Sequence, residues 1–231
     1  MSKKMTNVQK RYVDQVERIQ ERHSLGQTGE QTHIASPLVM VTLPHSDPKC
    51  LTWERSSNNL RLILGCRTIQ DPNTGESRLS GLPYGVYPRL ILYYLCHQVK
   101  IVARPEIDLH RSLAAFMTER LGIKGVTGGR NGSVTHFKEQ LTRLMNAIIT
   151  LEALDTHEGW LGMTSQDILI ADKRFLWWDA NLNRATTLPK VVKLSNDFFQ
   201  MVMHHSIPLD IEAIKAVRNS SLAAEKTTAL V

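Results

Sequence analysis

The sequence contains few cysteines, and those present are far apart. Only three occur among its 231 residues, and none belongs to a CxxC pair: Cys50, Cys66 and Cys96. An odd number of widely spaced cysteines argues against a disulfide framework and is typical of a protein in a reducing cytosol. We therefore expect a cytoplasmic protein.

Long apolar runs are also missing. The longest covers residues 90–96, far short of the roughly 18 residues that a membrane-spanning helix needs. The first residues alternate charged and polar side chains and contain no signal-peptide core. We therefore expect no membrane partner.

Motifs for catalysis and metal binding are absent as well. The sequence has no Walker motif, no GxSxG, no His-hydrophobic-His triplet and no paired acidic motif. Cys96 lies more than 100 residues before the His204-His205 pair, so no metal-ligand cluster is indicated. We expect a protein that is not an enzyme and uses no cofactor and no metal.

Basic residues exceed acidic ones, and the excess is local. The chain has 28 Lys plus Arg against 22 Asp plus Glu, a formal net charge of +6. Residues 111–146 hold six basic residues and two acidic ones, a net of 6 − 2 = +4. Such an excess favours an anionic partner such as nucleic acid.

The first half of the chain predicts an N-terminal arm followed by a folded domain with helices and strands. A sparse apolar stripe predicts an amphipathic helix over residues 6–24, with a turn-rich linker after it. The body is expected to begin at Ser36, with strands at 38–42 and 60–64 and a turn at 71–75. Pro88 suits the first turn of a helix, and residues 106–109 should be extended.

The centre of the chain predicts two helices joined by a turn. Ser112 caps the first, which Gly122 closes, and the connection GVTGGRNG follows. The second begins near Asn131 or Ser133 and runs to about residue 148. Its inward side chains recur at spacings of three and four: Val134, Phe137, Leu141, Leu144, Met145 and Ile148. Its opposite face should carry Thr135, His136, Glu139, Arg143 and Asn146, with Lys138 on the flank.

The rest of the chain predicts a hairpin, a strand and two helices. Runs 166–171 and 174–178, joined at Asp172-Lys173, should form the hairpin, and residues 188–194 a further strand. Ser195 can cap a helix to about His204, and residues 209–218 suggest another. The expected class is α+β: a winged helix, meaning a helix-turn-helix plus β-hairpin wing, with an N-terminal helical arm.

This order favours DNA binding. In a winged helix the second helix enters the major groove and the hairpin follows the backbone. A helix N-terminus with free N–H groups also suits phosphate. The candidate DNA-binding residues are Arg111, Lys124, Arg130, Asn131, Ser133, Thr135, His136, Lys138, Arg143, Lys173 and Arg174.

Several of these features have ordinary structural interpretations. Arg143 lies four residues after Glu139, so the two can form a surface ion pair. His136 could be a solvent-exposed residue without a role. The loop glycines more simply provide turn conformations, and Trp177 or Trp178 is better explained by packing than by base stacking.

Several segments also resemble a known family. GLPYGVYPRLIL (81–92), SLAAFMTERLGI (112–123), TGG..G (127–132), FKEQLTRL (137–144), FLWW (175–178) and VVKLSNDFFQMV (191–202) keep the order and spacing found in plasmid-encoded RepA replication initiators. The resemblance extends over roughly residues 36–222. It implies binding of repeated origin sequences (iterons), recruitment of host replication proteins such as a helicase or the host initiator, and often repression of the initiator's own gene.

The resemblance also sets expectations for domains. In the family, a segment like PLDIEAIKAVRNSSLA (208–223) leads into a second winged-helix module. We therefore expect an arm at 1–35, a winged-helix initiator domain at 36–205 and the start of a C-terminally truncated second module at 206–231. Two alternatives remain: a protein–protein or dimerisation module, giving a homodimer, and a metal-dependent DNA-nicking initiator.

Overall fold

The computed structural model describes residues 31–70, 74–109, 112–157, 160–173 and 191–210, together with residues 17, 18, 21, 24 and 25. Side chains are described for these residues except 155–157, 160, 161 and 173. Most of the helix expected at 6–24 lies outside the described residues, although 17, 18, 21 and 24 are helical.

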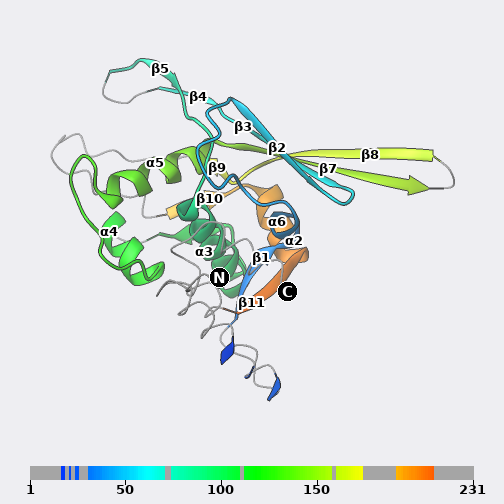
Figure 1. The fold of residues 1–231 in the computed structure, drawn as a ribbon, viewed down its shortest axis with the longest axis horizontal. Coiled ribbons are helices and arrows are strands. Elements are labelled where there is room, and N and C mark those ends of the chain that lie inside the picture. Colours follow the sequence, from blue (N-terminus) through cyan, green and yellow to red (C-terminus); the bar gives the residue numbers. More distant parts are fainter. Residues whose placement is uncertain are drawn as a thin grey trace, which may run out of the picture.

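The largest sheet is a four-stranded antiparallel one, made of two hairpins. Its order is β2 (Thr52–Ser57), β3 (Leu60–Gly65), β7 (Ile148–His157) and β8 (Trp160–Leu169). Leu62 pairs with Leu151 and Leu64 with Ile149, which brings apolar side chains to one face. The β7–β8 hairpin extends past the end of β3 and projects from the body (Figure 1).

Helix α3 (Val86–Val102) lies at the centre of the core. It is buried over most of its circumference, and β1, α5 and α6 pack against it. Aromatic rings join it to the helices that follow. These rings pack edge-on. The distance between ring centres is 4.9 Å for Tyr94 and Phe116, 5.9 Å for Phe116 and Phe137, and 5.4 Å for Tyr87 and Phe137.

Two helical segments follow α3 in the chain. Strand β6 (Glu106–Asp108) leads to α4 (Leu113–Ala115), which continues as the π-helical turn η1 (Phe116–Arg120). A glycine-containing loop then connects to α5 (Ser133–Asn146). Ser112 caps α4 as expected, because its hydroxyl accepts a hydrogen bond from the Ala115 N–H at 3.2 Å.

The described residues also form small sheets and two further helices. β1 (Gln31–Ala35) pairs with β11 (Ser206–Asp210), and β4 (Thr68–Gln70) pairs with β5 (Ser77–Leu79). β10 (Val191–Leu194) lies between β6 and β9 (Ala171–Lys173). Helix α2 (Ser36–Met40) follows β1, and α6 (Asn196–His204) begins at the Ser195 cap, as predicted.

The expected strand at 38–42 is wrong. Residues Ser36–Met40 form α2, with Pro37 in its first turn, where the fixed backbone angle of proline suits a helix start. The Val41 N–H donates to the Pro37 carbonyl at 3.1 Å and closes the helix. The strand lies just before it, as β1, so residues 31–35 pack with the body rather than with the arm.

The first strand of the expected hairpin, residues 166–171, is corrected. The hairpin that follows α5 is formed by β7 and β8, and β7 begins two residues after α5 ends. Ile148 was assigned to the helix because its apolar spacing continues the helical stripe, yet it starts the strand. Residues 166–169 belong to β8 and Ala171 to β9, while residues 174–178 lie outside the described part.

The expected helix at 209–218 is also corrected at its start. Leu209 and Asp210 belong to β11, which pairs with β1, and residues 211–218 lie outside the described part. Among the residues that the structure describes, no helix has both the length and the apolar character needed to cross a bilayer.

Candidate nucleic-acid interface

Helix α5 separates apolar and polar side chains over its first two turns. Val134, Phe137 and Leu141 are buried in the core, as the spacing predicted. Thr135 and His136 lie on the opposite side, exposed to solvent, as does Glu139. The N-terminal half of α5 therefore offers a polar surface.

The C-terminal half of α5 differs from the expectation. Asn146, predicted to face outward, is 2% exposed, and its amide donates to the Thr142 carbonyl at 2.7 Å. Gln140 and Thr142 are buried too. The prediction for Asn146 is wrong because residues distant in sequence cover this half of the helix.

The loop before α5 caps the helix. Thr127 and Ser133 bond reciprocally: the Thr127 N–H donates to Ser133 Oγ at 2.9 Å and the Ser133 N–H to Thr127 Oγ1 at 3.1 Å. The Val134 N–H donates to the Thr127 carbonyl at 3.2 Å. These N–H groups were expected to be free for phosphate, and that expectation is wrong. An anion near this end must be held by side chains.

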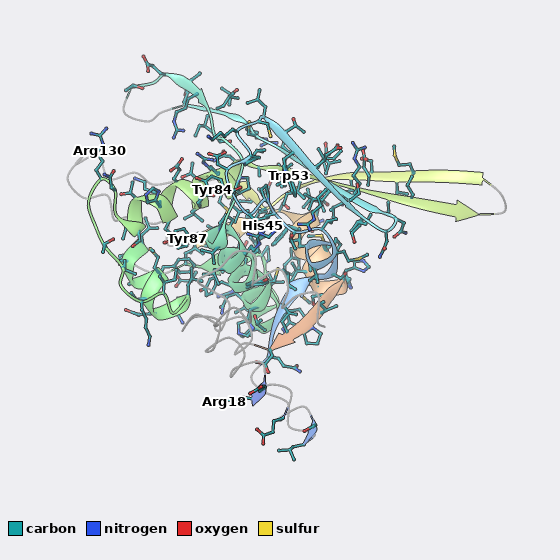
Figure 2. The ribbon with its side chains drawn as sticks, viewed as in Figure 1. Arg18, His45, Trp53, Tyr84, Tyr87 and Arg130 are labelled. Carbon is teal, nitrogen blue, oxygen red and sulfur yellow. The ribbon has the colours of Figure 1, made fainter. Side chains whose placement is uncertain are left out.

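The same loop carries cationic and amide side chains that are exposed to solvent and can contact an anion. Lys124, Arg130 and Asn131 are exposed, and Arg130 points away from the body (Figure 2). Within the described part of the chain, no carboxylate lies within ion-pair distance of Lys124 or Arg130. Lys138, on the flank of α5, is half-buried, and burial lowers the pKa of its ammonium group.

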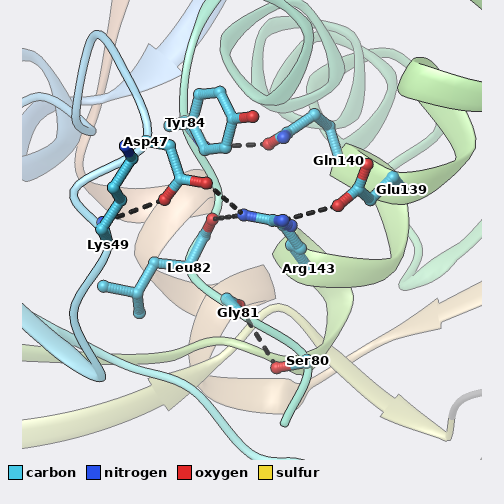
Figure 3. Close-up of polar contacts among 9 residues, drawn as sticks. All are labelled: Asp47, Lys49, Ser80, Gly81, Leu82, Tyr84, Glu139, Gln140 and Arg143. Carbon is cyan, nitrogen blue, oxygen red and sulfur yellow. Dashed lines mark hydrogen bonds and ion pairs between the residues drawn. The ribbon is translucent and has the colours of Figure 1, made fainter.

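Arg143 lies in a cluster of intramolecular contacts (Figure 3). Its guanidinium group donates to the Leu82 carbonyl at 3.2 Å and to Glu139 Oε1 at 2.5 Å, and pairs with Asp47 at 3.6 Å. It also lies 5.2 Å from the centre of the Tyr84 ring. The expected Arg143–Glu139 ion pair is confirmed, but the Arg143 side chain is only 15% exposed.

Gly81 makes room for this arginine. A Cβ at Gly81 would lie 3.0 Å from the Arg143 guanidinium carbon, and its φ of +73° favours glycine. Next to it, the Tyr84 N–H donates to Gln140 Oε1 at 2.9 Å. Segment 81–84 is thus attached to the side of α5 by two α5 side chains.

The sequence did not reveal this cluster. Asp47, Gly81, Leu82 and Tyr84 lie at least 56 positions from the α5 residues that they contact. GLPY is present in the sequence as a motif, but no local pattern shows that it packs on Arg143.

Three candidate residues cannot be placed against this surface. Arg111 and Arg174 lie outside the described residues, and of Lys173 only the backbone is described. Lys173 pairs with Lys193 of β10 and is not part of the β7–β8 hairpin. In the described part of the chain, no three His, Cys, Asp or Glu side chains are grouped so as to hold a metal ion.

Comparison with known proteins identifies the family. A sequence profile described as plasmid encoded RepA protein matches residues 82–227, more than half of the chain. The chain belongs to this family of replication initiators. The resemblance of its motifs to the plasmid-encoded RepA family is thereby confirmed.

No curated protein matches this RepA chain. Among solved structures, the crystal structure of selenomethionine derivatives of domain 2 and domain 3 of RctB matches it with a TM-score of 0.45 and 13% identity. The match covers 74% of this chain and 61% of the RctB chain, so this chain spans less than two thirds of that structure.

Proposed function

We propose that this RepA protein binds double-stranded origin DNA through a winged helix and so acts as a plasmid replication initiator without chemistry of its own. In this proposal α4 with η1 is the first helix of the helix-turn-helix, α5 is the recognition helix and the β7–β8 hairpin is the wing. The element order, α3, β6, α4 with η1, α5 and then a hairpin, supports it.

The observation that carries the proposal is the asymmetry of α5. Its N-terminal half is exposed and polar, and it adjoins a loop with uncommitted basic side chains, whereas its C-terminal half is covered. Helix-turn-helix proteins contact base edges with the N-terminal residues of the recognition helix. The exposed part of α5 is therefore the part that a recognition helix needs.

The candidate residues divide into roles under this proposal. Thr135 and His136 face the base edges, while Lys124, Arg130 and Asn131 hold phosphates on either side. Ser133 shapes the turn, Lys138 meets the backbone from the flank, and Arg143 orients α5 instead of touching bases. On sequence alone, Arg111, Lys173 and Arg174 are proposed as further phosphate contacts.

The biological partners are proposed from the family. They are the repeated origin sequences, host replication proteins and the promoter of the protein's own gene. A second candidate function, association of two copies, is favoured by the β8 strand. Among the described strands, β8 is at the edge of the four-stranded sheet, and Met163, which lies opposite Leu154, is 62% exposed.

A binding titration tests the DNA proposal. Fluorescence anisotropy of a labelled origin duplex should show affinity that falls steeply with salt, with a log–log slope of about −0.9 per neutralised phosphate. Arg130→Ala should reduce that slope by about one for all sequences alike. His136→Ala should instead reduce the preference for the origin repeat over a scrambled duplex by roughly 1–3 kcal/mol.

Two outcomes contradict the proposal. One is the absence of duplex binding at low salt. The other is binding that does not respond to salt, because phosphate contacts release counterions and cannot be insensitive to their concentration.

A further inference from the structure

The β4–β5 hairpin is not part of the proposed winged helix. Its strands have three residues each, and every described residue from 74 to 79 is exposed. It rises from the body on the side where the α5 loop projects (Figure 1). A two-stranded ribbon without a core of its own is at best marginally stable in water, so this hairpin contributes little to the core of the protein.

One face of this hairpin carries two arginines. Ile69 lies directly opposite Arg78, and Arg67 lies two residues before Ile69 on the same face. Neither guanidinium group has a carboxylate within ion-pair distance in the described part of the chain. The opposite face carries Thr68, Gln70 and Ser77, which are exposed as well.

The two ends of the hairpin differ in charge. Glu76 adjoins the turn, whereas Arg67 adjoins the base and Arg78 lies in the middle of β5. Glu76 lies two residues before Arg78, so it weakens the attraction of this face for an anion. Any contact with an anion must therefore be made mainly by the two arginines, on the part of the hairpin nearer the body.

The base of the hairpin is joined to α5. The Ser80 N–H donates to the Arg67 carbonyl at 2.8 Å, and the Arg67 N–H donates to Ser80 Oγ at 3.2 Å. Ser80 Oγ also donates to the Gly81 carbonyl at 3.3 Å, and Gly81 packs on the Arg143 guanidinium (Figure 3). A short chain of contacts thus connects the hairpin to α5.

We propose that the β4–β5 hairpin is a second nucleic-acid contact, binding phosphates of the duplex next to the segment that α5 occupies. The inference rests on the proposed DNA-binding function and extends it to a second element. A guanidinium group presents a fork of donors that matches phosphate oxygens, and hydroxyl and amide side chains are common phosphate partners. The contacts from Ser80 through Gly81 to Arg143 join the hairpin to α5, so the two elements would meet the DNA backbone at neighbouring places.

The test is a salt titration on the double variant Arg67→Ala/Arg78→Ala. Each arginine lost should reduce the log–log salt slope by about 0.9, which corresponds to a loss of about eightfold in affinity per arginine at 0.1 M salt. Glu76→Gln, in the same hairpin, should raise the affinity for DNA, because it removes a negative charge two residues from Arg78.

A truncated duplex and a charge-matched variant serve as controls. Arg61→Ala removes an arginine paired with Glu54 and Glu152 on another sheet, and it should leave the slope unchanged. When the duplex is trimmed at the end that the hairpin covers, the affinity of the wild type should fall by the same factor as the double substitution causes on the full duplex. The affinity of the double variant should be the same for the full and the trimmed duplex.

The outcomes separate the inference from the proposed function. If the double variant binds with wild-type affinity and slope while Arg130→Ala is impaired, DNA binding stands and the hairpin contact is wrong. If the double variant binds DNA normally but loses a replication protein in a pull-down, the hairpin contacts protein and the inference is again wrong. If the wild type does not bind duplex DNA at all, both the proposed function and the hairpin contact are wrong.

Discussion

The role that the structure gives Arg143 differs from the role that the sequence predicted. On a helical projection it belongs to the outer face of α5, among residues expected to touch DNA. In the fold its guanidinium group contacts Asp47, Leu82, Tyr84 and Glu139. Its charge is compensated within the molecule, so its main effect is on the position of α5.

Arg143→Ala should therefore destabilise the protein. It leaves the Leu82 carbonyl without its donor and removes the partner of two carboxylates, so the free energy of unfolding should fall by about 1–3 kcal/mol. Urea denaturation measures the change. Arg130→Ala, at an exposed site, should stay within about 0.5 kcal/mol of the wild type. Equal stability of the two variants would show that the Arg143 contacts do not form in solution.

His33 gives the fold a pH dependence. It lies in β1 on α3, and burial, then Lys100 and then His97 lower the pKa of its imidazole. The unfolded chain takes up the proton near pH 6.5, before the folded state does. The stabilisation is thus fully present above that pH and is lost as the pH falls through the lower, folded-state value.

His33→Gln should accordingly reduce the loss of stability on acidification. The free energy of unfolding, measured in urea at pH 7.5 and 5.5, should differ less between the two pH values for the variant than for the wild type. His136→Gln, at an exposed position on α5, controls for the loss of one histidine. A wild-type response in His33→Gln would contradict the argument.

At the scale of elements, the junction between the loop and α5 depends on one glycine. A Cβ at Gly132 would lie 2.5 Å from the Thr127 carbonyl oxygen and closer still to that of Gly128. Both are backbone atoms of the turn that caps α5, so they cannot move aside without breaking the cap.

Gly132→Ala should lower the free energy of unfolding by about 2 kcal/mol, as steric backbone changes do, and weaken duplex binding by displacing Arg130. The control is Gly128→Ala in the same loop, where an added Cβ meets nothing within 4 Å. Thermal denaturation and anisotropy report the two effects. If both alanine variants behave alike, the turn rearranges easily and does not position the arginine.

At the scale of the whole molecule, we expect the proposed initiator to bind DNA without cutting it. The sequence contains neither a Walker motif nor the His-hydrophobic-His triplet of nicking initiators. The purified protein should leave supercoiled plasmid intact with Mg²⁺ or Mn²⁺ and release no phosphate from ATP. Nicking that co-purifies with the protein through successive columns would overturn this prediction.

The sequence by itself determined the elements whose signals are local. The apolar spacing of three and four residues located most of α5, Pro88 marked the first turn of α3, and Ser112 and Ser195 marked the starts of α4 and α6. Such signals are readable because the interacting groups lie within one helical turn. The family motifs were readable for the same reason, since they are short runs of adjacent residues.

Only the tertiary structure decided features that depend on distant partners. Strand β7 was missed because the apolar residues after Asn146 fit a helix as well as a strand until β3 pairs with them. β1 is held by β11 from the other end of the chain. Arg143 has a structural role because Asp47 and residues 81–84, which are distant in the sequence, contact its side chain. Burial and pairing are properties of the whole chain, so no local pattern could specify them.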